Sequence, residues 1–232
     1  MASAQERTLM NGFSFPSDLS SVVCLGAHPD DIEIGAGGLV ASLRGGYPDA
    51  TFRFIVVTGS EERTAEAGVS ATMLLGTNGS IVVGEFTDGF VPYENPGDVK
   101  RFVRSALPTG GIDLVIAPQL SDRHQDHAFV AALAGQLFRD QVILGYEIAK
   151  FDGGLDAPNL YVPLSSMEAS AKVAHLKESF PSQLGHHWFT DDAFLALMKL
   201  RGIESNAPEG FAEGFVTTKM VVGVAKTAPG AS

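Results

Sequence analysis

Hydrophobic residues gather in short runs along the first two thirds of the chain. These runs are rich in valine and isoleucine and cover residues 21–26, 52–58, 80–84, 113–117 and 142–148. Most are continuously apolar, which is typical of strands covered on both faces. The segments between them carry apolar residues at helical spacing, namely 37–44, 61–75, 96–106 and 127–139. This alternation predicts a single Rossmann-like α/β domain with a mostly parallel sheet flanked by helices.

The pattern changes after residue 150. Residues 151–163 are expected to form a loop, 167–179 and 191–201 helices, and 214–224 a late strand. Because right-handed crossovers bring parallel strand ends to one edge, we expect this C-terminal segment to cap an active-site edge of the sheet. The predicted organisation is a flexible arm over residues 1–20, one domain over 21–225 and a flexible tail over 226–232.

Composition and charge limit the binding partners and the cellular compartment that we expect. The chain has 232 residues and a formal net charge of −11, which argues against a general electrostatic surface for nucleic acid or an anionic membrane. Its single cysteine, Cys24, excludes an intrachain disulfide and is expected to be buried. Because the N-terminus does not resemble a signal peptide and no apolar run approaches the ~20 residues of a membrane span, we expect a cytoplasmic protein. The oligomeric state stays open, a homo-oligomer included.

The first apolar run ends in an unusual polar motif. VVCLGAHPDDIEIGAGG, residues 22–38, places His28, Asp30 and Asp31 directly after the predicted strand. Two adjacent carboxylates repel each other and burial raises that cost, so a positive partner is expected. A histidine and an aspartate three residues apart supply two metal ligands, whereas a catalytic zinc usually takes three and keeps a position for water.

A third ligand is available after another strand. PQLSDRHQDHAFVAAL follows the apolar run at 113–117 and contains His124, Asp126 and His127. Either histidine would complete a set of two imidazoles and one carboxylate with the first motif. Such a set fits zinc, but also iron(II) or another divalent ion. The metal would lower the pKa of its bound water toward about 7.

The remaining side chains suit metal-assisted hydrolysis of an amide or ester. Asp30 would act on the metal-bound water as general base, and the unused histidine would stabilise an oxyanion or protonate a leaving amine. Asp126 would orient that imidazole. The purely structural alternatives are a helix N-terminus for the first motif and a solvated loop for the second. A dinucleotide loop is excluded because no G-x-G-x-x-G follows the strand, so the glycines at 35, 37 and 38 are assigned to close helix–sheet packing.

At this point the sequence resembles a known family. AHPDDIEIGAGG and DRHQDH are similar to the two signature motifs of the PIG-L/LmbE-like zinc-dependent deacetylases, which remove an acetyl group from N-acetylglucosamine-type sugars or their conjugates. TGSEERTAEAGVSATMLLG, FTDGFVP, FPSQ and RGIESNAPEGFAEGF resemble further segments of the family in the right order. Ile32, Gln125 and Phe211 depart from residues common in the family, and none of them is a proposed ligand.

The resemblance assigns roles position by position. It implies that His28, Asp31 and His127 ligate zinc, with zinc-bound water as the nucleophile. It implies Asp30 as general base and His124 at the oxyanion, oriented by Asp126. It also implies that Arg63 and Asp88 contact sugar hydroxyls. The expected substrate is a small N-acetylated amino sugar or amino-sugar conjugate, and the missing membrane anchor separates the chain from members that act on glycolipid.

Other candidates have weaker support. Glu147, at the end of a predicted strand, is expected to touch substrate or to cap a loop. His186, His187 and Trp188 either form an aromatic wall for a sugar ring or divide between packing and solvent. Two other functions remain open: an amidase for thiol–sugar conjugates with a larger acyl group, and a non-catalytic sugar- or nucleotide-binding module.

Overall fold

The apolar runs form one central sheet in the computed structural model, which describes residues 13–221. Its strands are β1 (Ser21–Gly26), β2 (Thr51–Thr58), β3 (Gly79–Phe86), β4 (Leu114–Pro118), β5 (Val142–Tyr146), β6 (Leu160–Leu164) and β7 (Phe211–Val216). They lie in the order β3-β2-β1-β4-β5-β7-β6. The first five are parallel, while β7 runs antiparallel to both β5 and β6. The prediction of a mostly parallel sheet is confirmed.

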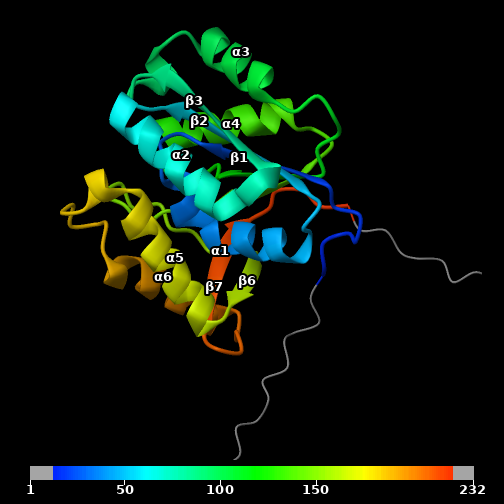
Figure 1. The fold of residues 1–232 in the computed structure, drawn as a ribbon, viewed down its shortest axis with the longest axis vertical. Coiled ribbons are helices and arrows are strands. Elements are labelled where there is room, and N and C mark those ends of the chain that lie inside the picture. The colour runs from blue at the N-terminus through cyan, green and yellow to red at the C-terminus, as the bar shows by residue number, and fades with distance from the viewer. Residues whose placement is uncertain (1–12, 222–232) are drawn as a thin grey trace, which may run out of the picture.

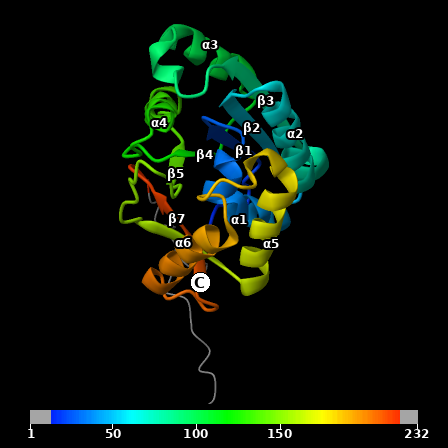
Figure 2. The same cartoon turned by 90° about the vertical axis from the view of Figure 1, so that its left-hand side faces the viewer.

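Helices cover both faces of this sheet, as Figures 1 and 2 show. They are α1 (Asp31–Gly46), α2 (Glu61–Leu75), α3 (Pro96–Ala106), α4 (Gln125–Leu137), α5 (Ser166–Ser179) and α6 (Asp191–Glu204). Helices α3 and α4 pack on one face, and α1, α2, α5 and α6 contribute to the core on the other. Short 3-10 turns lie at Gly76–Asn78, Val91–Tyr93 and Pro181–Gln183. The chain therefore forms the predicted α/β domain, with helices flanking a mostly parallel sheet.

Three predicted elements differ from the structure. The loop expected over 151–163 contains strand β6, the late strand expected over 214–224 is Phe211–Val216, and the helix expected from residue 37 begins at Asp31. Strand β6 contains Pro163, and proline is tolerated there because β6 is an edge strand. Pairing with β7, rather than local pattern, makes this segment a strand.

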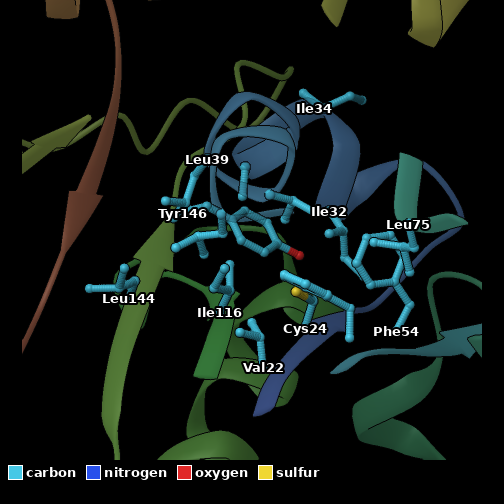
Figure 3. Close-up of a cluster of buried hydrophobic side chains, with 14 of the residues drawn as sticks. Val22, Cys24, Ile32, Ile34, Leu39, Phe54, Leu75, Ile116, Leu144 and Tyr146 are labelled. Atoms are coloured by element: carbon cyan, nitrogen blue, oxygen red, sulfur yellow. The ribbon is translucent and has the colours of Figure 1, made fainter. Parts of the chain in front are cut away.

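The core explains the glycines that follow the first motif. Tyr146 lies between α1 and the sheet (Figure 3), and its hydroxyl donates to the Leu25 carbonyl at 2.9 Å. A Cβ on Gly35 would sit 2.2 Å from the Tyr146 ring, so only glycine allows this approach. Cys24 is buried in the same cluster. Close helix–sheet packing and a buried cysteine are both as predicted.

The beginning of the chain is partly outside the described residues, as is the end. Within residues 13–20 of the expected arm, Leu19 is buried and Phe15 packs against the core, so these residues lie on the domain. Residues 1–12 and the predicted tail over 226–232 lie outside the described range. Among the described helices, none has the length and apolar content that would carry it across a membrane.

Candidate metal centre and active site

The strand order brings the two polar motifs together. The sheet reverses its direction of growth between β1 and β4, and open α/β sheets place their sites at the carboxyl ends of strands beside such a switch. His28 follows β1 directly, and Asp31 begins α1. His127 lies in the first turn of α4, after β4. Residues 99 positions apart in the sequence therefore share one edge of the sheet.

Three side chains have the geometry of metal ligands. His28 Nδ1 lies 3.1 Å from His127 Nε2. Asp31 Oδ1 lies 3.3 Å from His127 Nε2, and Asp31 Oδ2 lies 3.5 Å from His28 Nδ1. Zinc bonds of about 2.0–2.2 Å in tetrahedral geometry separate ligand atoms by about 3.3–3.6 Å. The two imidazoles and the carboxylate therefore lie close enough together to bind one divalent cation.

The charges of these groups depend on one another. Burial alone would raise the pKa of Asp31, but the charges of His127 and His28 and their hydrogen bonds hold it well below its usual range. Burial would lower the pKa of His28, but Asp31 and hydrogen bonds to nearby carboxylates raise it well above its usual range. Backbone N–H groups of Ala27 and His28 also donate to Asp31 Oδ2, at 2.9 and 2.8 Å. The site favours positive charge, which a cation would supply.

Each candidate histidine ligand has a carboxylate at its other ring nitrogen. Asp122 Oδ2 lies 3.1 Å from His127 Nδ1, and Asp126 Oδ2 lies 3.0 Å from His28 Nε2. Such carboxylates fix the orientation and tautomer of metal-binding histidines. The sequence interpretation missed Asp122, although it is the first residue of DRHQDH. Lys150 Nζ in turn donates to Asp122 Oδ2 at 2.5 Å.

The placement of Asp126 differs from the prediction. Its carboxylate contacts His28 and accepts from the backbone N–H groups of Gly89 and Val91, at 2.7 and 3.2 Å. It does not hold the His124 ring; instead the Asp126 backbone N–H donates to His124 Nδ1 at 3.3 Å. Residues two positions apart at the start of a helix do not face each other, which explains the change of partner.

His124 lies against both candidate histidine ligands. Its ring centroid is 5.0 Å from that of His28 and 4.6 Å from that of His127. One ring nitrogen from each of the three histidines lies within 4.8 Å of the other two. Burial lowers the pKa of His124, and the charges of the other two histidines lower it further. A neutral imidazole is therefore favoured beside the candidate metal ligands.

Asp30 has an unusual backbone and a buried carboxylate. Its φ of 98° and ψ of −22° lie in the left-handed region, which costs a non-glycine residue ~1–3 kcal/mol. It occupies the N-cap of α1, yet its side chain makes no capping hydrogen bond. The side chain is only 5% exposed, and Oδ2 has no hydrogen-bond partner among the described residues. Helix capping therefore does not account for Asp30.

An arginine faces this carboxylate. Arg63 Nη2 lies 3.0 Å from Asp30 Oδ2, and the same nitrogen donates to the Pro29 carbonyl. Burial raises the pKa of Asp30 to about 8, against the lowering effect of the Arg63 charge. Arg63 Nε is 3.6 Å from Glu66 Oε2. The predicted sugar contact is thus also a neighbour of the predicted base.

A cavity of about 500 Å³ opens over these groups. The predicted site residues that line it are His28, Asp30, Asp31, Arg63, Asp88, His124 and His127. Trp188 and Gln183 line it too, together with residues that the sequence interpretation did not single out, among them Lys150 and Phe151. Asp88 is largely exposed and its Oδ1 lies 3.0 Å from His28 Nε2.

Glu147 lies outside this cavity, which corrects its expected contact with substrate. Both of its carboxylate oxygens accept from Arg201, with Nε–Oε1 and Nη2–Oε2 distances of 2.6 Å. The residue follows β5 and is buried against α6. Its place at the active edge was correctly inferred, but its partner is an arginine of the same chain.

Comparison with known proteins fits this geometry. The sequence profile of the PIG-L family, described as GlcNAc-PI de-N-acetylase, matches residues 23–138 and so spans half of the chain and both motifs. The chain belongs to the PIG-L family. This PIG-L match includes every candidate ligand and Asp30, whereas β5 to β7 and the last two helices lie beyond it.

Solved structures share the fold of this PIG-L protein. The N,N'-diacetylchitobiose deacetylase from Pyrococcus horikoshii is 21% identical, with 92% of this chain and 88% of that chain covered and a TM-score of 0.66. The conserved protein TT1542 from Thermus thermophilus is 22% identical, with 89% and 98% covered and a TM-score of 0.66. The 4-carboxy-2-hydroxymuconate hydratase GalB from Pseudomonas putida is 14% identical, with 90% and 100% covered and a TM-score of 0.61. Since a hydratase shares the fold, the reaction must be argued from the site.

Proposed function

We propose that this protein is a metal-dependent hydrolase that removes the N-acetyl group from an amino sugar or an amino-sugar conjugate. The observation that carries the proposal is one juxtaposition: the candidate ligands His28, Asp31 and His127 lie 3.1–3.5 Å apart, beside the buried Asp30 carboxylate in the same cavity. Membership of the PIG-L family supports the amide of an N-acetylated sugar as the target.

The donor set suits zinc. Two imidazole nitrogens and one carboxylate oxygen are typical of catalytic zinc sites, and iron(II) accepts the same donors. When bound, such an ion polarises a carbonyl and makes water a stronger nucleophile at neutral pH. Asp122 and Asp126 would hold the two imidazoles in the orientation that binding requires.

The protein groups account for the proton transfers of amide hydrolysis. Asp30 Oδ2 would accept a proton from the attacking water, whose oxygen bonds to the acetyl carbon. Protonated Asp30 would then donate that proton to the nitrogen as the C–N bond breaks, which yields acetate and the free amine. His124, at the cavity wall, would donate a hydrogen bond to the developing oxyanion.

Sugar contacts would come from the side of the cavity formed by β2 and β3. Arg63, in the first turn of α2, and Asp88, which follows β3 and has an exposed carboxylate, both line this side. Carboxylate and guanidinium groups recognise hydroxyls by hydrogen bonds in fixed directions. We assign both to the sugar ring, with Arg63 also acting on Asp30.

The test is a release-of-acetate assay over a panel that includes N-acetylglucosamine and N,N'-diacetylchitobiose. Protein as purified, chelator-treated protein and protein reloaded with zinc or iron(II) are compared, and bound metal is quantified. We expect acetate release that chelation abolishes and one of the two metals restores. Reloaded protein that holds one metal per chain and hydrolyses no acetylated amino sugar in the panel would overturn the proposal and favour a binding module. Cleavage of bulkier amides alone would favour the thiol–sugar amidase.

A further inference from the structure

The cavity has two chemically different ends. At the β2 and β3 end it is lined by polar groups such as Ser60, Arg63 and Asp88. At the β5 end its wall includes the apolar side chains of Ile148, Phe151 and Trp188, beside the charged Lys150 and Asp152. The candidate metal ligands lie between the two ends, because β1 and β4 are the middle strands of this edge. A volume of about 500 Å³ is within the ~300–1,000 Å³ range of sites that enclose drug-sized ligands.

The aromatic side chains at the β5 end come from two loops that are distant in sequence. Phe151 follows β5, and its ring lies 4.7 Å from that of His187, at 70°. Trp188, in the same loop as His187, contacts Phe189 edge-on with a centroid distance of 5.5 Å. Phe151 remains 75% exposed although it lines the cavity. A ligand that covered this ring would gain the free energy of burying a large apolar surface.

The wall is anchored to the metal centre. Lys150, next to Phe151, donates to Asp122 and to the Ile148 carbonyl, at 2.5 and 3.2 Å. Asp122 in turn contacts the His127 ring. Beyond Phe151 the chain turns back through two glycines with left-handed φ, and the Gly154 carbonyl accepts from Gln119 Nε2 at 2.7 Å. The residue before Phe151 is thus linked to the candidate ligand His127 through Asp122.

We propose that the β5 end is a second subsite, in which Phe151 and Trp188 bind an aromatic or other apolar substituent of the substrate. The inference rests on the proposed function, since it places the reacting amide between the two ends of the cavity. The substituent is either an aglycone on the sugar or the carbon chain of a longer acyl group, and both present the same apolar surface. The protein would then prefer a substrate that carries such a substituent to one that lacks it.

The kinetic test compares three substrates: methyl and phenyl glycosides of N-acetylglucosamine, and N-hexanoylglucosamine. We expect kcat/KM for at least one apolar substrate to exceed that for the methyl glycoside about tenfold, and Phe151→Ala to remove most of this preference. A preference for the phenyl glycoside identifies the aglycone, and a preference for the hexanoyl amide identifies the acyl chain. The control is Phe13→Ala, an equally exposed phenylalanine (79%) that precedes β1 at the opposite edge of the sheet; it should leave the preference intact.

A binding test separates this inference from the proposed function. Trp188 is the single tryptophan of the chain, so its fluorescence reports directly on the subsite. We expect a nitrophenyl glycoside of N-acetylglucosamine to quench it saturably, and Phe151→Ala to weaken this binding about tenfold. Quenching without any hydrolysis would refute the proposed function but keep the subsite. Unchanged substrate ratios in Phe151→Ala, or no saturable quenching, would overturn the subsite.

Discussion

Buried carboxylates have different bonding partners in the two halves of the molecule. In the half that ends with α4, the buried Asp30 lines a cavity, and its Oδ2 lies 3.0 Å from Arg63 Nη2 but accepts no regular hydrogen bond from the described residues. In the half from β5 onward, Glu147 accepts from Arg201 through both oxygens. Both carboxylates follow a parallel strand at the same edge of the sheet, yet one faces a cavity and the other is fully bonded to an arginine of α6.

The second half contains another buried ion pair of the same kind. Lys172 Nζ donates to Glu213 Oε1 and to the Ile34 carbonyl, both at 2.6 Å. Glu213 also accepts from the backbone N–H groups of Gly38 and Leu39, at 2.8 and 2.7 Å. The pair joins α5 and β7 to the middle of α1. A buried charge therefore indicates a reactive site when its bonding is incomplete and turned toward a cavity, rather than because it is buried.

The largest expected effect comes from Asp30. Asp30→Asn keeps the shape of the side chain and removes the proton acceptor, so acetate release should fall about 10²- to 10⁴-fold. Bound metal, measured by elemental analysis, should stay at the wild-type level because the candidate ligands are intact. An Asp30→Asn protein that holds its metal and works at the wild-type rate would contradict the role of Asp30.

Arg201→Met tests the structural side of the comparison. It leaves Glu147 buried without its partner, and breaking a buried pair in this way costs about 3–5 kcal/mol of the free energy of unfolding. The double variant Arg201→Met with Glu147→Leu should recover most of that loss, because no lone charge remains. Urea denaturation of the three proteins measures both effects. A single variant as stable as wild type would show that the pair is dispensable.

Glu33 sharpens the comparison, because it is a buried carboxylate of the first half that accepts from the Ser70 hydroxyl. Burial raises its pKa from 4.5 to about 7. The folded state therefore binds more protons than the unfolded chain, and stability falls as pH rises from 4.5 to 7. As the pH rises across that range, the stability of Glu33→Gln relative to wild type should increase by roughly 3 kcal/mol, and the difference should stay constant at higher pH.

Denaturation curves at several pH values provide the measurement for Glu33. A difference between Glu33→Gln and wild type that stays constant over the range would show that the carboxyl titrates normally. Ser70→Ala, which removes the hydrogen bond to the carboxylate, should steepen the pH dependence because that bond lowers the pKa of Glu33.

The smallest expected effect is a displaced pH profile. The charge of Arg63 lowers the pKa of Asp30, so Arg63→Gln should raise it and move the acid limb of kcat/KM to higher pH by about one unit or more. Arg63→Lys keeps a positive charge and should leave the limb near its original position. If both variants raised KM and neither moved the limb, Arg63 would act on the sugar alone.

Much of the fold could be predicted because hydrophobic runs and their periodicity are local properties of the sequence. The bounds of β1, α2 and α3 agree with those expected from sequence. Strand β6 could not be predicted in this way, because a short proline-containing edge strand becomes a strand only through its partner β7.

Part of the candidate site could likewise be predicted from local motifs, and part of it could not. His28, Asp30 and Asp31 could be located because one contiguous motif ends a buried strand, and DRHQDH follows another. Spacing alone left His124 and His127 as alternative ligands, and only the family resemblance favoured His127. The distances of 3.1 and 3.3 Å from His127 Nε2 to His28 and Asp31 support that choice.

The sequence by itself determined the α/β architecture, the edge at which polar groups gather and the kinds of donor atom available there. The tertiary structure decided their partners: Asp122 on His127, Asp126 on His28, and Arg201 on Glu147. It also decided that Phe151 and Trp188 line one cavity. The reason is physical: periodicity sets which face of an element a residue occupies, whereas a side chain's partner depends on elements that pack there from elsewhere in the chain.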